Sequence, residues 1–147
     1  MNYDPELFGA QRPLQDLIED FEFLDDWEDR YAYLIDLGKQ LTTLPQQYKS
    51  EEYRVKGCTS QVWLIHSQTE EDGQVIHHYS ADSDAFIVRG LVAIVLSAYS
   101  GKTNHEIEQI DLATLFSKIG LERNLSVSRR NGFASMVAKV KAWAQQS

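Results

Sequence analysis

Residues 61–85 read QVWLIHSQTEEDGQVIHHYSADSDA, and this stretch decides the fold. Gln61 to Ser67 is rich in β-forming side chains, and Gln74 to Tyr79 has the same character. Between them, Glu70 to Gly73 has the polar and glycine-containing composition of a turn. The stretch therefore predicts an antiparallel β-hairpin.

The hairpin register gives a first estimate of what surrounds the single cysteine of the chain. If Thr69 faces Gln74 across the turn, extrapolation along the strands brings Cys58 close to Asp84 and Ala85. These residues begin the next helix, whose N-terminal dipole favours a thiolate, whereas the neighbouring aspartates oppose one. The sequence leaves the balance between these two effects open.

Amphipathic patterns predict helices on both sides of the hairpin in the sequence. The helix signals are Pro13, the Asp25-Asp26 pair with Pro45 at the other end, Asp82-Ser83-Asp84 before a long helix over Ala85 to Tyr99, the Thr103 and Glu106 capping box, Asp111, and Ser126 or Ser128. Tyr53 and Val55 alternate with charged residues and predict a further β segment. Strands confined to the middle favour an α+β fold, with a small antiparallel sheet and helices packed over one face.

Composition bounds the class of protein. The 147 residues suit one domain, which we place at residues 13–147, after an N-terminal arm at residues 1–12 that could be flexible. A net charge of -8 argues against nucleic acid as the main partner. The longest uncharged stretch, Gly90 to Gly101, is too short to span a membrane, and the Met1 end lacks a signal-peptide pattern. We expect a cytoplasmic protein.

Cys58 is the residue with the clearest chemical potential. A lone cysteine is more often a small buried hydrophobe, but Cys58 follows Gly57 and precedes polar residues, as a loop residue would. His66 lies eight residues along an extended segment, roughly 20 Å away at ~3.3 Å per residue, so it cannot serve as a catalytic base. One cysteine cannot form an internal disulfide, and too few ligands accompany it for structural zinc, so we expect no intrinsic metal or cofactor.

The segment around this cysteine resembles the signature of a known family. Val55-Lys56-Gly57-Cys58-Thr59-Ser60-Gln61-Val62-Trp63 is similar to the motif of the SufE family, the sulfur acceptors of cysteine desulfurases. Further agreeing blocks are Trp27 to Tyr31, Leu34 to Gly38, Asp82 to Ala85, Ile87 to Leu91 and Ser126 to Gly132. Two positions depart from the family pattern, since Asn124 and Val127 replace a common histidine and proline.

The resemblance implies a SufE/IscU-like fold and a sulfur-transfer accessory role rather than a stand-alone enzyme. Cys58 would accept persulfide sulfur from a desulfurase of the SufS or CsdA type, which carries its own pyridoxal phosphate, and would stimulate that desulfurase. It would rest near an apolar pocket and pass sulfur to a cluster scaffold or another acceptor. Gly57, Gln61, Asp84 and Arg129 occupy supporting positions in the matching blocks.

Three points stay open at this stage. Arg129 is expected either to pair with Asp82 or Asp84, or to stabilise the sulfur anion on Cys58. The chain could activate a desulfurase by docking alone, without carrying sulfur. An IscU-like cluster scaffold is less favoured, because such scaffolds need several cysteine ligands.

Overall fold

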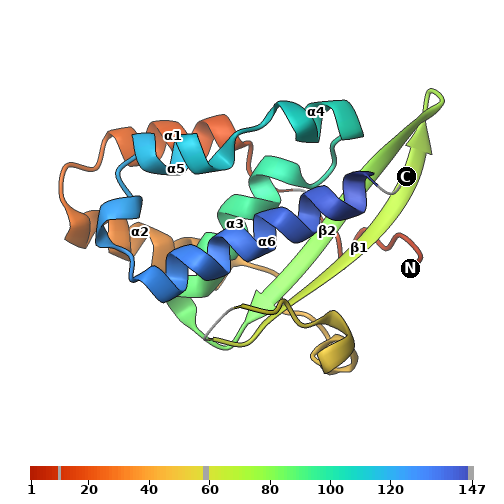
Figure 1. Cartoon of the computed structure of the whole chain (residues 1–147), viewed down its shortest axis with the longest axis horizontal. Coiled ribbons are helices and arrows are strands. Elements are labelled where there is room, and N and C mark those ends of the chain that lie inside the picture. The colour runs from red at the N-terminus through yellow and green to blue at the C-terminus, as the bar shows by residue number, and fades with distance from the viewer. Residues whose placement is uncertain (10, 58–59, 146–147) are drawn as a thin grey trace.

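The computed structural model describes residues 1–9, 11–57 and 60–145, in which a two-stranded antiparallel hairpin runs along one side of the helices (Figure 1). Strand β1 covers Val62–Glu71, and strand β2 covers Gln74–Ser83. Asp72 and Gly73 join the strands with positive φ angles of 51° and 79°. Two such residues in succession make the tight turn that suits the right-handed twist of a hairpin. The predicted hairpin is therefore present.

The register of the hairpin differs from the predicted one by two residues. Glu71 faces Gln74, whereas Thr69 faces Ile76. The sequence suggested a turn of four residues, but Asp72 and Gly73 turn the chain within two. Because side chains alternate with a period of two, this shift changes the cross-strand neighbours and leaves each side chain on the same face of the sheet.

Helices precede and follow the hairpin in the chain. Their bounds are α1 Leu14–Glu22, α2 Trp27–Gln40, α3 Phe86–Tyr99, α4 Asn104–Gln109, α5 Leu112–Lys118 and α6 Val127–Gln145, with short 3-10 turns η1 Gln46–Tyr48, η2 Glu51–Tyr53 and η3 Glu122–Asn124. The predicted caps at Asp26, Thr103 and Asp111 are confirmed, since each side chain accepts a backbone N–H of the first turn. Ser126, rather than Ser128, accepts such a bond at the start of α6.

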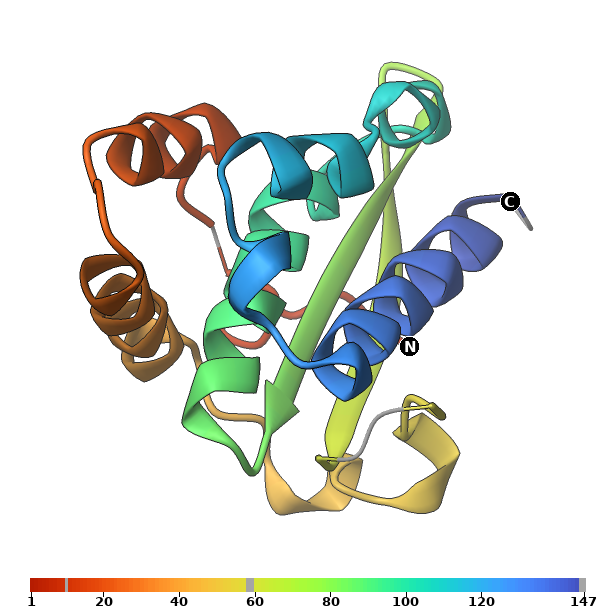
Figure 2. The ribbon, with the colours of Figure 1, turned by 60° about the vertical axis from the view of Figure 1, so that its left-hand side comes forward.

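The helices cover one face of the hairpin, with α3 at the centre of the core. Nearly every residue of α3 is buried, and Leu64, Tyr79 and Ala81 face it from the strands. Figure 2 shows α6 running beside the hairpin, where the Tyr79 hydroxyl donates to the Val140 carbonyl oxygen over 3.0 Å. This arrangement confirms the predicted α+β class, with a small antiparallel sheet and helices over one face.

Irregular segments cover the opposite face of the hairpin. Trp63 and Ile65 point to this side and form a second buried cluster with Phe8 and Leu44. The β segment predicted around Tyr53 is wrong, because Tyr53 lies in the 3-10 turn η2. Only the end of that segment meets the sheet, where the Val55 N–H donates to the Val62 carbonyl oxygen over 2.8 Å. Away from its turn, the hairpin is thus buried on both sides.

Polar side chains in contact with one another form a row across the hairpin, from α6 on one side to α4 on the other. His66 Nε2 lies 2.8 Å from His77 Nδ1, and His77 Nε2 contacts Asn104 Oδ1. Because an amide oxygen only accepts, His77 donates from Nε2 to Asn104. Burial lowers the pKa of both imidazoles, which favours their neutral forms, and a neutral His77 with its proton on Nε2 accepts at Nδ1 from His66. Trp143 stacks on His66 with ring centroids 5.1 Å apart. This row of contacting side chains fixes the end of α6 to the hairpin.

This arrangement predicts a loss of stability in mild acid. Burial first, and then His77, lowers the pKa of His66 to about 4. A histidine whose folded pKa lies below its unfolded value of about 6.5 contributes full stability above pH 6.5, and that contribution falls as the pH drops toward 4. We expect a His66→Gln variant to show a flatter decline in its urea midpoint between pH 7 and 5. His105→Gln, at an exposed histidine, should keep the wild-type slope; equal slopes for all three proteins would contradict the assignment.

Candidate functional site

Two described residues flank Cys58 and Thr59 in the sequence, and both lie close to α6. Cys58 and Thr59 lie outside the described residues, but Gly57 and Ser60 on either side of them are defined. Gly57 has φ +90°, and a Cβ placed there would lie 2.8 Å from Ser135 Oγ on α6. Ser60 borders a cavity between α3 and α6. These two anchors hold the ends of the loop against the N-terminal half of α6.

This cavity has a volume of about 290 Å³ and is lined by both apolar and polar residues. Its apolar wall is formed by Val88 and Leu91 from α3 with Phe133 and Met136 from α6. Its polar lining residues are Ser60, Ser126, Ser128 and Arg129. A small pocket that combines an apolar wall with a guanidinium and hydroxyl groups suits a soft, partly desolvated anion, such as a thiolate or persulfide.

Arg129 is the cation of the cavity. Its backbone N–H donates to Ser126 Oγ over 3.2 Å, which starts α6 and places this residue in the first turn. The side chain is exposed and forms no ion pair with another described residue. Its guanidinium is therefore available to a ligand or to an anion on the neighbouring loop. An anion at this point also benefits from the positive end of the helix dipole.

Asp84 and Gln61 bond to each other at the open end of the hairpin, next in the chain to the cavity residue Ser60. The Gln61 N–H donates to Asp84 Oδ1 over 3.1 Å, and the Asp84 N–H donates to the Gln61 carbonyl oxygen over 3.3 Å. Asp84 was expected to cap α3, but its side chain holds the start of β1 instead. The neighbour relation predicted for Cys58 from the hairpin register lies outside the described residues.

Asp82 forms a buried ion pair on the far side of the hairpin from the cavity. Its carboxylate is fully buried, contacts the Arg89 guanidinium, lies 3.6 Å from Lys49 Nζ, and accepts the Leu44 N–H over 3.0 Å. Arg89 also donates to the carbonyl oxygens of Gly38 and Leu41. Asp82 was expected as a helix cap or a partner of Arg129, and the structure gives it neither role. It ties α3 to the segment that follows α2.

Among the residues that line this cavity, the sequence named Arg129 as a site residue, and it named none of the serines or apolar side chains in that role. Val88 and Leu91 are three residues apart on α3, and Arg129, Gly132 and Met136 follow helical spacing on α6. Of these residues, Leu91 and Met136 were expected to face the core as part of the amphipathic patterns of their helices. The stripe on α6 carries an arginine at one end, which is the signal that could have indicated a lined cavity rather than a closed core.

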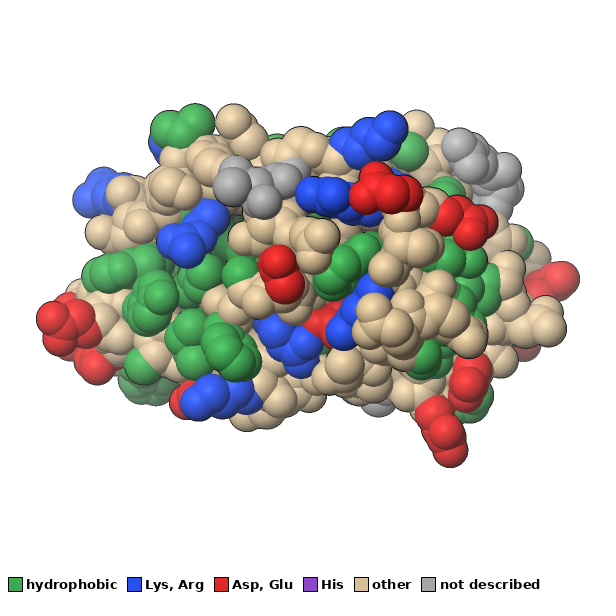
Figure 3. Space-filling view, turned by 90° about the horizontal axis from the view of Figure 1, so that it is seen from below, with side chains coloured by type: hydrophobic (Ala, Val, Ile, Leu, Met, Phe, Trp, Pro, Cys, Tyr) green, Lys and Arg blue, Asp and Glu red, His purple; other side chains and the backbone are tan. Residues whose placement is uncertain are grey.

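The surroundings of the cavity are partly apolar. Phe86 and Val127 are 61% and 62% exposed, and they neighbour the cavity residues Val88, Ser126 and Ser128 in the chain. Figure 3 shows hydrophobic side chains gathered on the underside of the molecule, at the end where α2 and the starts of α3 and α6 lie. Exposed apolar surface beside a reactive site is typical of a surface that meets another protein.

Two further observations concern the described residues only. They contain no group of three or more histidine, cysteine, aspartate or glutamate side chains arranged to hold a metal ion. In the same part of the chain, each helix is too short or too polar to cross a membrane. The expectation of no intrinsic cofactor stays a prediction.

The structure is that of a small α+β protein in which Ser60, two residues after the single cysteine of the sequence, borders a cavity lined by both apolar side chains and an arginine. Comparison with known proteins identifies the family, because the SufE model, described as an Fe-S metabolism associated domain, matches residues 15–144. The chain belongs to the SufE family, as its sequence motifs indicated.

Relatives of known sequence agree with this assignment. An uncharacterized SufE-like protein of Rhizobium etli is 51% identical over 132 residues, covering 90% of this chain and 89% of the relative. The sulfur acceptor protein CsdE of Escherichia coli is 37% identical over 139 residues, covering 95% and 92%. A hypothetical protein of Thermus thermophilus, solved in solution, matches with a TM-score of 0.66 and 19% identity over 99% of this chain and 100% of its own, which supports the fold.

Proposed function

We propose that this chain accepts sulfur from a cysteine desulfurase on Cys58 and delivers it for iron–sulfur cluster assembly. The observation that carries the proposal is the cavity beside the cysteine loop, which is lined by both Arg129 and apolar side chains. The similarity to a protein named as a sulfur acceptor, and to a domain associated with Fe-S metabolism, supports the same chemistry.

The transfer is an exchange between sulfur atoms. The Cys58 thiolate attacks the outer sulfur of a persulfide on the desulfurase cysteine. A new sulfur–sulfur bond forms on Cys58, the bond on the desulfurase breaks, and the desulfurase cysteine leaves as a thiolate. No external oxidant or reductant is consumed. The step requires an ionised thiol and a cation that stabilises the anion, and Arg129 is the exposed cation at this cavity.

Intact mass spectrometry tests the proposal directly. After incubation with a SufS- or CsdA-type desulfurase and cysteine, the wild-type chain should gain one sulfur atom that dithiothreitol removes. Cys58→Ser should gain none and should stimulate the desulfurase less, because the acceptor thiol is absent. A Cys58→Ser protein that stimulates the desulfurase fully would instead support activation by docking alone.

The role of Arg129 is tested in the same assay. We expect Arg129→Gln to slow sulfur acceptance by roughly 10- to 100-fold, since a hydrogen bond to a charged group contributes about 1.5–3 kcal/mol. Arg130→Gln is the matched control, because Arg130 is an exposed neighbour with the same charge that does not line this cavity. Equal slowing in the two variants would show a general charge effect and remove Arg129 from the site.

A further inference from the structure

A second hollow, separate from the cysteine loop, lies where α2, α5 and the segment between α5 and α6 meet. Its volume is about 430 Å³, and it shares no lining residue with the cavity beside Ser60. Figure 1 shows these three elements at the same end of the molecule, away from the tip of the hairpin. The hollow plays no part in the sulfur transfer proposed above.

Cations from three different elements line this hollow. Arg30 comes from α2, Lys118 from the last turn of α5, and Arg123 from η3, with the side chains of Ser117 and Asn124 between them. Asp25 is the one carboxylate among the lining residues whose side chains are described. The whole chain carries a net charge of -8, so three cations around one hollow stand out against its average surface. None of the three forms an ion pair with another described residue.

Arg30 supplies the observation that points to a ligand. Its Nε is buried and has no hydrogen-bond partner among the described residues. The guanidinium is held against the Gly120 turn, where a Cβ would lie 2.7 Å from Nη1. Buried donors almost always have an acceptor, because leaving one unpaired is costly. The guanidinium also borders the hollow, so an anion bound there would lie against it and supply the charged partner that no described residue provides.

We propose that this hollow binds a tetrahedral oxyanion, namely a phosphate or sulfate group. Cations that approach from three elements match the several oxygens of such a group, whereas a carboxylate offers a single edge. Arginine in particular forms paired hydrogen bonds with phosphate oxygens. Trp27 forms part of the wall and gives an organic phosphate an apolar surface to lie against.

Titration followed by ¹H–¹⁵N correlation spectra tests this site in the intact protein. Inorganic phosphate and sulfate are added at constant ionic strength, maintained with sodium chloride. We expect saturable shifts of the Gly120 amide and the Trp27 indole signals. Shifts that grow linearly, or that sodium chloride reproduces, would overturn the proposal.

Substitutions at exposed lining residues test this particular site, with little effect on the stability of the protein. Lys118→Gln and Arg123→Gln should each weaken phosphate binding roughly tenfold. Lys39→Gln is the matched control, because Lys39 is also an exposed lysine in the last turn of a helix, away from the hollow. It should change the affinity less than twofold. Equal weakening by Lys39→Gln and Lys118→Gln would overturn the site.

Phenyl phosphate shows whether the site prefers the phosphate group of an organic molecule or the free inorganic anion. Tighter binding than inorganic phosphate, with the gain removed by Trp27→Leu, would assign the phosphate to an organic molecule. Equal binding would assign the site to the free inorganic anion. Either result supports an oxyanion site, and the absence of saturable binding by both compounds contradicts it.

Discussion

An Asp82→Ala variant is expected to lose about 3–5 kcal/mol of unfolding free energy, the usual cost of removing one partner from a buried ion pair. The Asp82 carboxylate is fully buried, and Arg89, whose side chain is 13% exposed, is its closest cation. Without the carboxylate, the Arg89 guanidinium remains largely enclosed beside the carbonyl oxygens of Gly38 and Leu41, with no counter-ion there. The Leu44 N–H also loses its acceptor.

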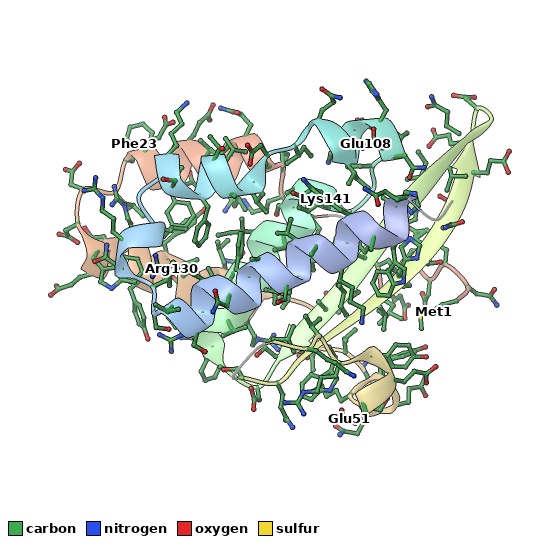
Figure 4. All side chains as sticks on the ribbon, viewed as in Figure 1. Met1, Phe23, Glu51, Glu108, Arg130 and Lys141 are labelled. Atoms are coloured by element: carbon green, nitrogen blue, oxygen red, sulfur yellow. The ribbon has the colours of Figure 1, made fainter. Side chains whose placement is uncertain are left out.

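Urea unfolding at pH 7 measures this loss, with Glu51→Ala as the control. Glu51 pairs with Arg54 at the surface, where the Glu51 side chain is 81% exposed, so its removal should cost no more than about 1 kcal/mol. Similar losses in the two variants would show that the buried pair contributes no more than a surface one. Figure 4 shows Glu51 on η2 at the foot of the molecule, in the irregular region that this buried pair joins to α3.

Gly90→Ala is the second substitution with a large expected effect. At Gly90, α3 passes so close to α2 that a Cβ would lie 2.2 Å from the Leu34 carbonyl oxygen. The clash is with backbone, so it is relieved only if the two helices move apart. We expect a loss of roughly 1–3 kcal/mol or more, the range for overpacking a close contact.

Helix propensity alone predicts the opposite sign for this substitution. Alanine is favoured over glycine by about 1 kcal/mol in a helix interior, and Ala32→Gly at an exposed position of α2 should measure that preference. Thermal and urea unfolding of both variants give the comparison. A Gly90→Ala protein that is more stable than wild type would contradict the close packing of α2 on α3.

The features that local sequence could predict are those set by neighbouring residues. The capping residues Asp26, Thr103 and Asp111 bond to N–H groups three residues away, so short spacing revealed them. The hairpin was also predictable, because Asp72-Gly73 is a strong turn pair flanked by β-forming residues. Its register was not, because a two-residue and a four-residue turn both fit the composition of this stretch.

The features that escaped prediction depend on contacts between distant segments. Asp82 has the sequence character of a helix cap, yet its partners Lys49 and Arg89 reach it only in the folded chain. Tyr53 and Val55 have a strand-like alternation, but a single bridge at Arg54 is all that pairs with β1. The family motif predicted Arg129 as a site residue, whereas the apolar wall formed by Val88, Leu91 and Met136 required the crossing of α3 and α6.

The cavity beside the cysteine loop has a consequence for the order of events during synthesis. It is lined by Ser60 from the segment before β1, by residues of α3, and by residues at the start of and within α6, which is the last helix of the described residues. Because the ribosome releases the N-terminal part first, the cysteine segment emerges well before the helix that carries Arg129, Phe133 and Met136. Contacts this distant in sequence also form late in folding. The nascent chain therefore presents a solitary thiol without its cation, and the complete cavity arises only once the last helix has docked.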